Sequence, residues 1–73
     1  MQLRRMAVWT DPHGRIVGQI SQGVQRTHEG WMPMYVAEAV GLATEPCPRF
    51  ACAKRKVEAA LLAAGIQAHG TAA

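Results

Sequence analysis

The pattern near the N-terminus consists of two short apolar segments, which flank the tetrapeptide DPHG at residues 11–14. Short apolar segments bounded by turn residues are typical of β-strands. In the tetrapeptide, Asp favours the first position of a type I turn, Pro fixes the φ angle of the second, and Gly accepts a left-handed backbone. The pattern therefore predicts a β-hairpin with strands at Arg5–Thr10 and Arg15–Ser21.

The middle of the chain admits two interpretations. After a loose polar connection at residues 22–30, the segment Trp31–Val36 alternates and is rich in aromatic and β-branched residues, as in a strand. As a helix, it would carry Pro33 in its first turn and end at Gly41. We favour the strand, because an isolated hairpin is marginal and a third strand gives a helix a sheet to cover. The pattern also allows a short fourth strand at Arg49–Ala51.

A helix is predicted from the segment ACAKRKVEAALLAAG at residues 51–65, with Gly65 as its end. At about 100° per residue, one side of this helix collects the apolar residues that should meet the core, namely Ala53, Val57, Ala60, Leu61 and Ala64. Residues 67–73 are expected to be a disordered tail. The chain is thus expected to form a single small α+β domain over residues 1–66, an antiparallel sheet packed against a C-terminal helix.

The composition is that of a small, mildly basic globular protein. The chain has 73 residues, of which 49% are hydrophobic and 18% charged, and its net charge is +3. This charge falls short of the dense basic surface of a dedicated nucleic-acid binder. No apolar run approaches the ~18 residues that cross a membrane, and the N-terminus lacks the apolar region of a signal peptide. We therefore expect a cytoplasmic protein without membrane contact.

Candidate catalytic and metal-binding groups are sparse. Cys47 and Cys52 are expected to be free thiols, and the three histidines at positions 13, 28 and 69 are scattered along the chain. A structural zinc site needs about four ligands at compact spacing, which these residues do not offer. No paired carboxylates and no phosphate-binding glycine loop stand out. We therefore expect no catalytic residues, no metal and no cofactor.

Three consecutive cations, Lys54, Arg55 and Lys56, occupy the first turn of the predicted helix. Cations are unfavourable there, because the free backbone N–H groups already make this end positive. The cluster is either solvated surface or a docking site for an acidic partner, and the sequence leaves both open. Leu62 is expected on the side of the helix that faces away from the core. We count it, with the three cations, among the candidate partner contacts.

Alternation also divides the predicted sheet into two apolar sets, of which a single helix covers one. We expect the aliphatic and Met residues to face the helix, which leaves the aromatic residues on the opposite side. The alternatives are swapped faces or a lid formed by residues 37–50. Aromatic residues and Arg are enriched in interface hot spots. The aromatic face is therefore the main candidate partner-binding surface, with Trp9, Trp31, Tyr35, Arg5 and Arg15.

The hairpin, the Trp-bearing third strand and Phe50 before the helix sequence KRKVEAALLAAG resemble a layout of small phage and mobile-element proteins. Several anti-CRISPR and other anti-defence inhibitors are of this β-meander-plus-helix type. The resemblance implies a non-enzymatic inhibitor that binds a host protein and blocks it sterically. The arm-binding domain of phage integrases is similar as well, and that likeness implies DNA binding instead.

Two classes of function remain open. The first is a protein-binding module, whose partner is a host protein with an acidic or aromatic-accepting surface, or a second copy in a homodimer. The second is a small nucleic-acid-binding protein that neutralises phosphates with Arg4, Arg5, Arg15, Arg26, Arg49 and Lys54–Lys56. We favour the first class, since the sheet has few polar side chains for reading bases.

Overall fold

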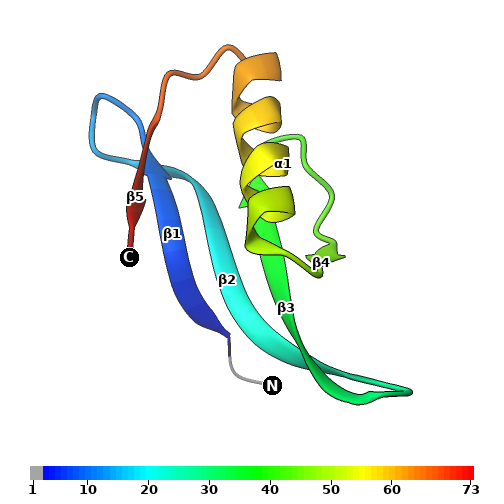
Figure 1. The fold of residues 1–73 in the computed structure, drawn as a ribbon. Coiled ribbons are helices and arrows are strands. Elements are labelled where there is room, and N and C mark those ends of the chain that lie inside the picture. The colour runs from blue at the N-terminus through cyan, green and yellow to red at the C-terminus, as the bar shows by residue number, and fades with distance from the viewer. Residues whose placement is uncertain (1–2) are drawn as a thin grey trace.

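One antiparallel sheet and one helix make up the computed structural model, which describes residues 3–73 (Figure 1). The helix α1, Phe50–Ala63, lies across one face of the sheet and confirms the predicted α+β class. The five strands lie side by side in the order β4-β3-β2-β1-β5. Their bounds are β1 Arg4–Thr10, β2 Ile16–Thr27, β3 Gly30–Ala39, β4 Pro46–Cys47 and β5 His69–Ala72.

The predicted N-terminal hairpin is present, and its turn has the expected chemistry. One carboxylate oxygen of Asp11 accepts hydrogen bonds from the backbone N–H groups of His13 and Arg15, both at 2.9 Å. The backbone N–H of Gly14 donates to the carbonyl of Asp11, and Gly14 has a φ of 80°, which explains the glycine. The hairpin between β1 and β2 is therefore confirmed.

The second strand is longer than predicted. β2 continues to Thr27, and its pairing with β3 runs without interruption from Gly18↔Ala39 to Thr27↔Gly30. Residues 22–30, expected as a loose connection, are thus a strand and a tight turn. The sequence signal was weak because residues 24–29 are exposed and carry polar side chains on both faces of the ribbon.

The ambiguous middle segment is the third strand, as favoured. β3 includes Pro33, which lies opposite Val24 in the part of the strand that pairs only with β2 among the described residues. An edge position of this kind tolerates the missing N–H of proline. The short strand allowed at Arg49–Ala51 is wrong, because Phe50 already begins α1 and β4 lies earlier, at Pro46–Cys47.

The C-terminal tail is ordered in part, which corrects the expectation of disorder. β5 pairs with β1 from Ala7↔Ala72 to Thr10↔His69, and the backbone N–H of Ala73 donates to the carbonyl of Met6 at 3.0 Å. A Cβ atom added at Gly70 would lie 2.8 Å from the indole nitrogen of Trp9. The tail is therefore anchored by backbone pairing and by close contact with one buried aromatic side chain.

The helix packs closely on the sheet through the predicted stripe. Its buried residues are Ala53, Val57 and Leu61, while Ala64 is the exposed C-cap. A Cβ atom added at Gly18 of β2 would lie 2.8 Å from Cγ1 of Val57, so the helix approaches the sheet where a side chain is missing. As predicted, Gly65 ends the helix, with a φ of 69°.

The predicted assignment of the two sheet faces is wrong for β1 and β3. Trp9 is only 4% exposed and belongs to the core cluster, and Tyr35 packs against that cluster. Small residues beneath the middle of the helix, such as Gly18 and Ala37, allow the helix to lie close to the sheet. The space beside the helix then accommodates the indole of Trp9. The cross-strand rows beneath the helix are Ala7–Ile20–Ala37 and Trp9–Gly18–Ala39. Of the aliphatic residues expected there, Val8 and Val36 lie on the opposite face, whereas Gly18 and Ile20 were placed correctly. Met6 lies at a β-bulge and lines a hollow with Phe50 and Lys54 of the helix.

Residues 40–45 form no lid over the opposite face of the sheet, of which Ser21 and Val36 are nevertheless only 7% exposed. The connection after β3 turns toward the helix instead, where Leu42 packs against the core. Glu45 forms an ion pair with Lys56 of α1, with 3.6 Å between the carboxylate oxygen and Nζ. The alternative of a lid formed by residues 37–50 is therefore not realised, because residues 40–45 form a loop on the helix side of the sheet.

Candidate protein-binding surface

A two-stranded ribbon projects from the body of the molecule. β1 pairs with β2 only as far as Arg4↔Gln22, and β4 pairs with β3 only at Tyr35 and Val36. Beyond these pairs β2 and β3 continue together, and we name residues 23–34 the β2–β3 arm. The arm extends past the end of α1, as Figure 1 shows, and gives the molecule its long dimension of 42 Å against 21 and 17 Å.

The arm carries large apolar side chains that nothing in the described chain covers. Trp31 is 65% exposed, Val24 48% and Met32 43%. Val24 and Trp31 lie on one face of the arm and Met32 on the other. Exposed apolar patches on a small monomer often mark an interaction site. The turn that links the strands is well defined, since the Thr27 hydroxyl donates to the carbonyl of Gly30 and accepts from the N–H of Glu29. The exposed apolar groups thus lie on an ordered hairpin.

The two faces of the arm differ in chemistry. Residues directly opposite in an antiparallel pair share a face, so Val24 lies with Pro33, and Arg26 lies with Trp31. This face continues the helix-covered side of the sheet, because Gly18, Ile20, Gln22, Val24 and Arg26 alternate without a register shift. The other face carries Gln25 opposite Met32. The core face of the sheet therefore extends, uncovered, into the arm.

The root of the arm is built around an aromatic pair. The rings of Tyr35 and Phe50 meet edge to face, with 5.8 Å between centroids and an interplanar angle of 79°. Arg4 pairs with Gln22, which pairs with Tyr35, so the three share one face. Phe50 begins α1, and 36% of it remains exposed. An apolar surface therefore leads from the first turn of the helix onto the arm.

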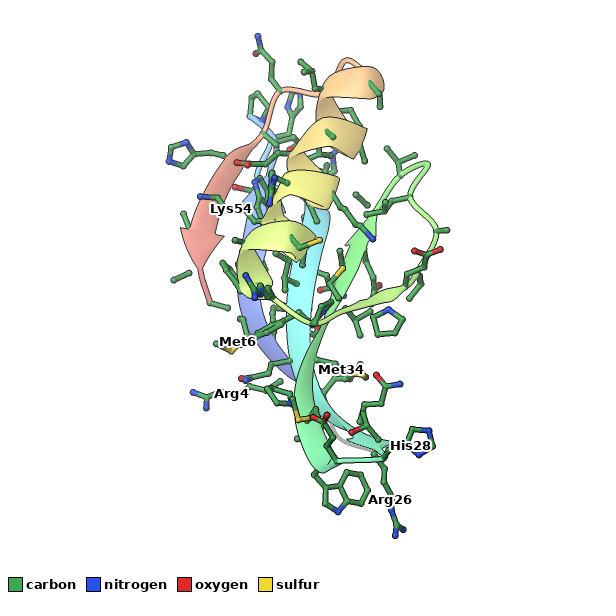
Figure 2. All side chains as sticks on the ribbon, turned by 45° about the vertical axis from the view of Figure 1, so that its right-hand side comes forward. Arg4, Met6, Arg26, His28, Met34 and Lys54 are labelled. Atoms are coloured by element: carbon green, nitrogen blue, oxygen red, sulfur yellow. The ribbon has the colours of Figure 1, made fainter. Side chains whose placement is uncertain are left out.

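Cations flank this surface. Arg49, the N-cap of α1, makes no side-chain capping hydrogen bond, and the first turn of the helix contains no acidic residue. Figure 2 shows Arg4 at the root of the arm and Arg26 and His28 at its tip, each pointing away from the ribbon. Lys54 points instead toward β5, where it lines a hollow of about 310 Å³ with Trp9 and Gly70. Arginine side chains therefore lie at both ends of the arm, Arg4 at the root and Arg26 at the tip.

The residues predicted to contact a partner are not brought together in one site. Trp31 lies on the arm, whereas Trp9 is buried and Tyr35 is half-buried at the arm's root. Arg15 lies at the opposite end of the sheet, where its Nε is 3.1 Å from the Asp11 carboxylate. Leu62 is 82% exposed and faces away from the core as expected. Arg5 pairs with Ser21 and so lies on the open face of the sheet.

The basic triplet also divides in the structure. Lys54 and Arg55 are exposed, while Lys56 is half-buried and forms the ion pair with Glu45. The negative charge that Cys47 would carry as a thiolate, followed by that of Glu45, raises the pKa of Lys56. Lys56 thus attaches the loop after β3 to the helix and is less available to a partner than its two neighbours.

Sequence reasoning missed Val24, Met32 and Pro33 as surface residues. The available signal was the tight turn at residues 27–30 between two alternating segments, which would have extended both strands. Arg26 and Arg49 were considered only as phosphate contacts. Their positions beside Trp31 and Phe50 follow from the register of β2 and β3 and from the start of the helix.

Residues 3–73 were compared with the requirements of metal-binding and membrane-spanning segments. No three His, Cys, Asp or Glu side chains gather to hold a metal ion there, and Cys47 and Cys52 are free thiols. The helix that the structure describes is too short and too polar to cross a membrane. Comparisons with protein families, with curated proteins and with solved structures found no match. The exposed side chains of the β2–β3 arm are therefore the evidence that bears on function.

Proposed function

We propose that the chain is a non-enzymatic protein-binding module and that the β2–β3 arm makes the contact. The observation that carries the proposal is the exposure of Trp31, Val24 and Met32 on an ordered ribbon that extends beyond the helix-covered core. Trp beside Arg is a combination enriched in the centres of protein interfaces. A hairpin stiffened by cross-strand pairing also loses little conformational entropy on binding.

Steric inhibition fits this arrangement. A small domain with a projecting hairpin can place the hairpin in a cleft of a larger protein while the body of the domain covers the cleft's entrance. The resemblance to anti-defence inhibitors of phages and mobile elements points to a host protein as the partner. We retain that as the expected biological setting of the module.

Capture experiments with matched variants test the proposed function. Trp31→Ala removes the largest exposed side chain of the arm, and Leu62→Ala removes a side chain of even greater exposure on the far side of the helix. Wild type and Leu62→Ala are expected to retain the same protein from an extract of the source cells, and Trp31→Ala is expected to lose it. Equal retention by all three would contradict a role for the arm.

Nucleic-acid binding is the second candidate, favoured by Arg26 beside the exposed indole of Trp31. Single-stranded nucleic acids bind to aromatic side chains flanked by cations. A salt titration with a single-stranded oligonucleotide and a duplex separates the candidates, since phosphate contacts give affinities that fall steeply with salt. We expect no binding near physiological salt, about 0.15 M.

A further inference from the structure

One face of the arm presents apolar side chains between two cationic ends. We name this face, together with the row of residues at the root of the arm, the arm strip; its members from root to tip are Arg4, Gln22, Tyr35, Val24, Pro33, Trp31 and Arg26. Arg26 follows Gln22, the residue opposite Arg4, by four positions along β2, and at 3.2–3.4 Å per residue this spans about 13 Å. The strip therefore has a defined length and a positive group at each end.

Acidic residues of the chain lie away from the body of the strip. Of the five, Asp11 belongs to the β1–β2 turn, and Glu38 shares the opposite face of the sheet with Gln19. Glu45 is paired with Lys56, and Glu58 lines hollows on the other side of α1 with Trp9. Glu29 lies in the turn at the tip. Neither Arg4 nor Arg26 forms a salt bridge within residues 3–73.

The uncapped start of the helix reinforces the positive root. Arg49 carries its charge next to the free N–H groups of the first turn of α1, and Phe50 connects this turn to the ring of Tyr35. A carboxylate bound beside Tyr35 and Phe50 would therefore lie near a favourable helix terminus. The helix terminus and Arg49 thus add positive potential next to Tyr35, beside the two arginines at the ends of the arm strip.

We infer that the arm strip binds an extended acidic segment of a protein partner, with carboxylates at its two ends and an apolar side chain between them. In an extended chain, side chains at positions i, i+2 and i+4 point to the same side, and the outer two are again about 13 Å apart. The expected pattern is therefore Asp or Glu, any residue, a large apolar residue, any residue, Asp or Glu. This inference rests on the proposed function and names the partner's chemistry.

The middle of the strip favours a peptide over a nucleic acid. Val24 and Pro33 form this part, and neither is a surface on which a base stacks. A single strand carries a phosphate at every nucleotide, whereas the strip offers cations only at its two ends. An apolar side chain between two acids satisfies both the middle and the ends of the strip.

Selection from a random peptide library displayed against the purified protein tests the inference. Enriched peptides are expected to share two acidic residues four positions apart with an aromatic or aliphatic residue midway. A synthetic peptide of the enriched sequence should shift the backbone amide resonances of residues 22–26 and 31–35. Its Gln-for-acid version should bind at least tenfold more weakly.

Variants of the protein locate the contact. Arg26→Gln and Arg4→Gln should each weaken the acidic peptide about threefold to fivefold, the range of a partly exposed charge pair. Arg55→Gln removes the same charge from an exposed helix position outside the strip and should leave the affinity unchanged.

Enriched peptides without acidic bias, no enrichment at all, or equal losses with Arg55→Gln would overturn the inference. Tighter binding of an oligothymidine than of the peptide at the same salt would assign the strip to nucleic acid and overturn it as well. If Trp31→Ala loses the captured protein but the enriched peptides contain no acidic residues, the proposed function stands and only the acidic segment is rejected.

Discussion

The close contact between Gly18 and Val57 predicts a strong and specific coupling between two core substitutions. In Gly18→Ala, the new Cβ atom would lie 2.8 Å from Cγ1 of Val57, well inside the ~3.5–4.0 Å at which carbon atoms attract. Val57 is fully buried in the core cluster against the sheet. Overpacking of this kind costs about 1–3 kcal/mol, partly offset by about 0.4–1 kcal/mol from the stiffer unfolded chain.

Val57→Ala removes the opposing methyl group and should relieve the clash. Alone, it deletes two buried methyl groups and leaves a cavity, at a cost of about 2–3 kcal/mol. In the double variant the new Cβ occupies part of that cavity and the benefit of the stiffer unfolded chain remains, so we expect a total loss about 0.4–1 kcal/mol below that of Val57→Ala alone. The two substitutions should therefore couple by at least about 1 kcal/mol.

Urea unfolding followed by circular dichroism measures the free energy of unfolding of the wild type, the two single variants and the double variant. A domain of 73 residues is expected to have about 4–11 kcal/mol of stability, enough for each variant to stay folded in water. Val24→Ala is the matched control, because Val24 is 48% exposed on the arm and outside the core cluster, so it should be additive with Val57→Ala. Losses for Gly18→Ala and Val57→Ala that add within about 0.5 kcal/mol would refute the close packing of helix on sheet.

Three further outcomes follow from the structure. Trp31→Phe should leave a blue-shifted emission spectrum that acrylamide quenches poorly, because the remaining Trp9 is buried; strong quenching would place Trp9 in solvent. The backbone N–H of Arg15, more than any other group, lowers the pKa of Asp11, so its carboxylate stabilises the turn above the ordinary value of 3.8 and this stability is lost as pH falls below it. The acid-dependent loss measured by urea unfolding should be smaller in Asp11→Asn. Replacing Lys54 and Arg55 with Gln should keep or slightly raise the melting temperature, since both are exposed cations at a helix start; a clear drop would show that their stems pack.

Local signals predicted the parts of the fold in which one segment determines its own structure. Asp11 and Gly14 determine the conformation of the turn at residues 11–14, and the helix has a clear apolar period and ends at Gly65. Both were located within a few residues. The extent of β2 was missed because the arm has no buried face, so the two-residue period that reveals a strand is weak there.

The orientation of the sheet depended on information that no single strand contains. Alternation shows that Trp9 and Val8 lie on opposite faces, but not which face the helix covers. That choice follows from Gly18 and Gly70, which make room for the helix and for the indole, and these contacts join residues far apart in sequence. The candidate site therefore differs from the predicted one: Trp31 is on the surface as predicted, Trp9 is in the core, and the arm is the exposed surface.

Amide hydrogen exchange of the protein alone and in complex with its captured partner is the most direct test of the arm as a binding surface. We predict that binding slows exchange in residues 22–35, with the largest change near Trp31, and leaves the helix around Leu62 unaffected. Protection confined to the open face of the sheet, around Val8 and Gln19, or to the end of α1 would contradict the account.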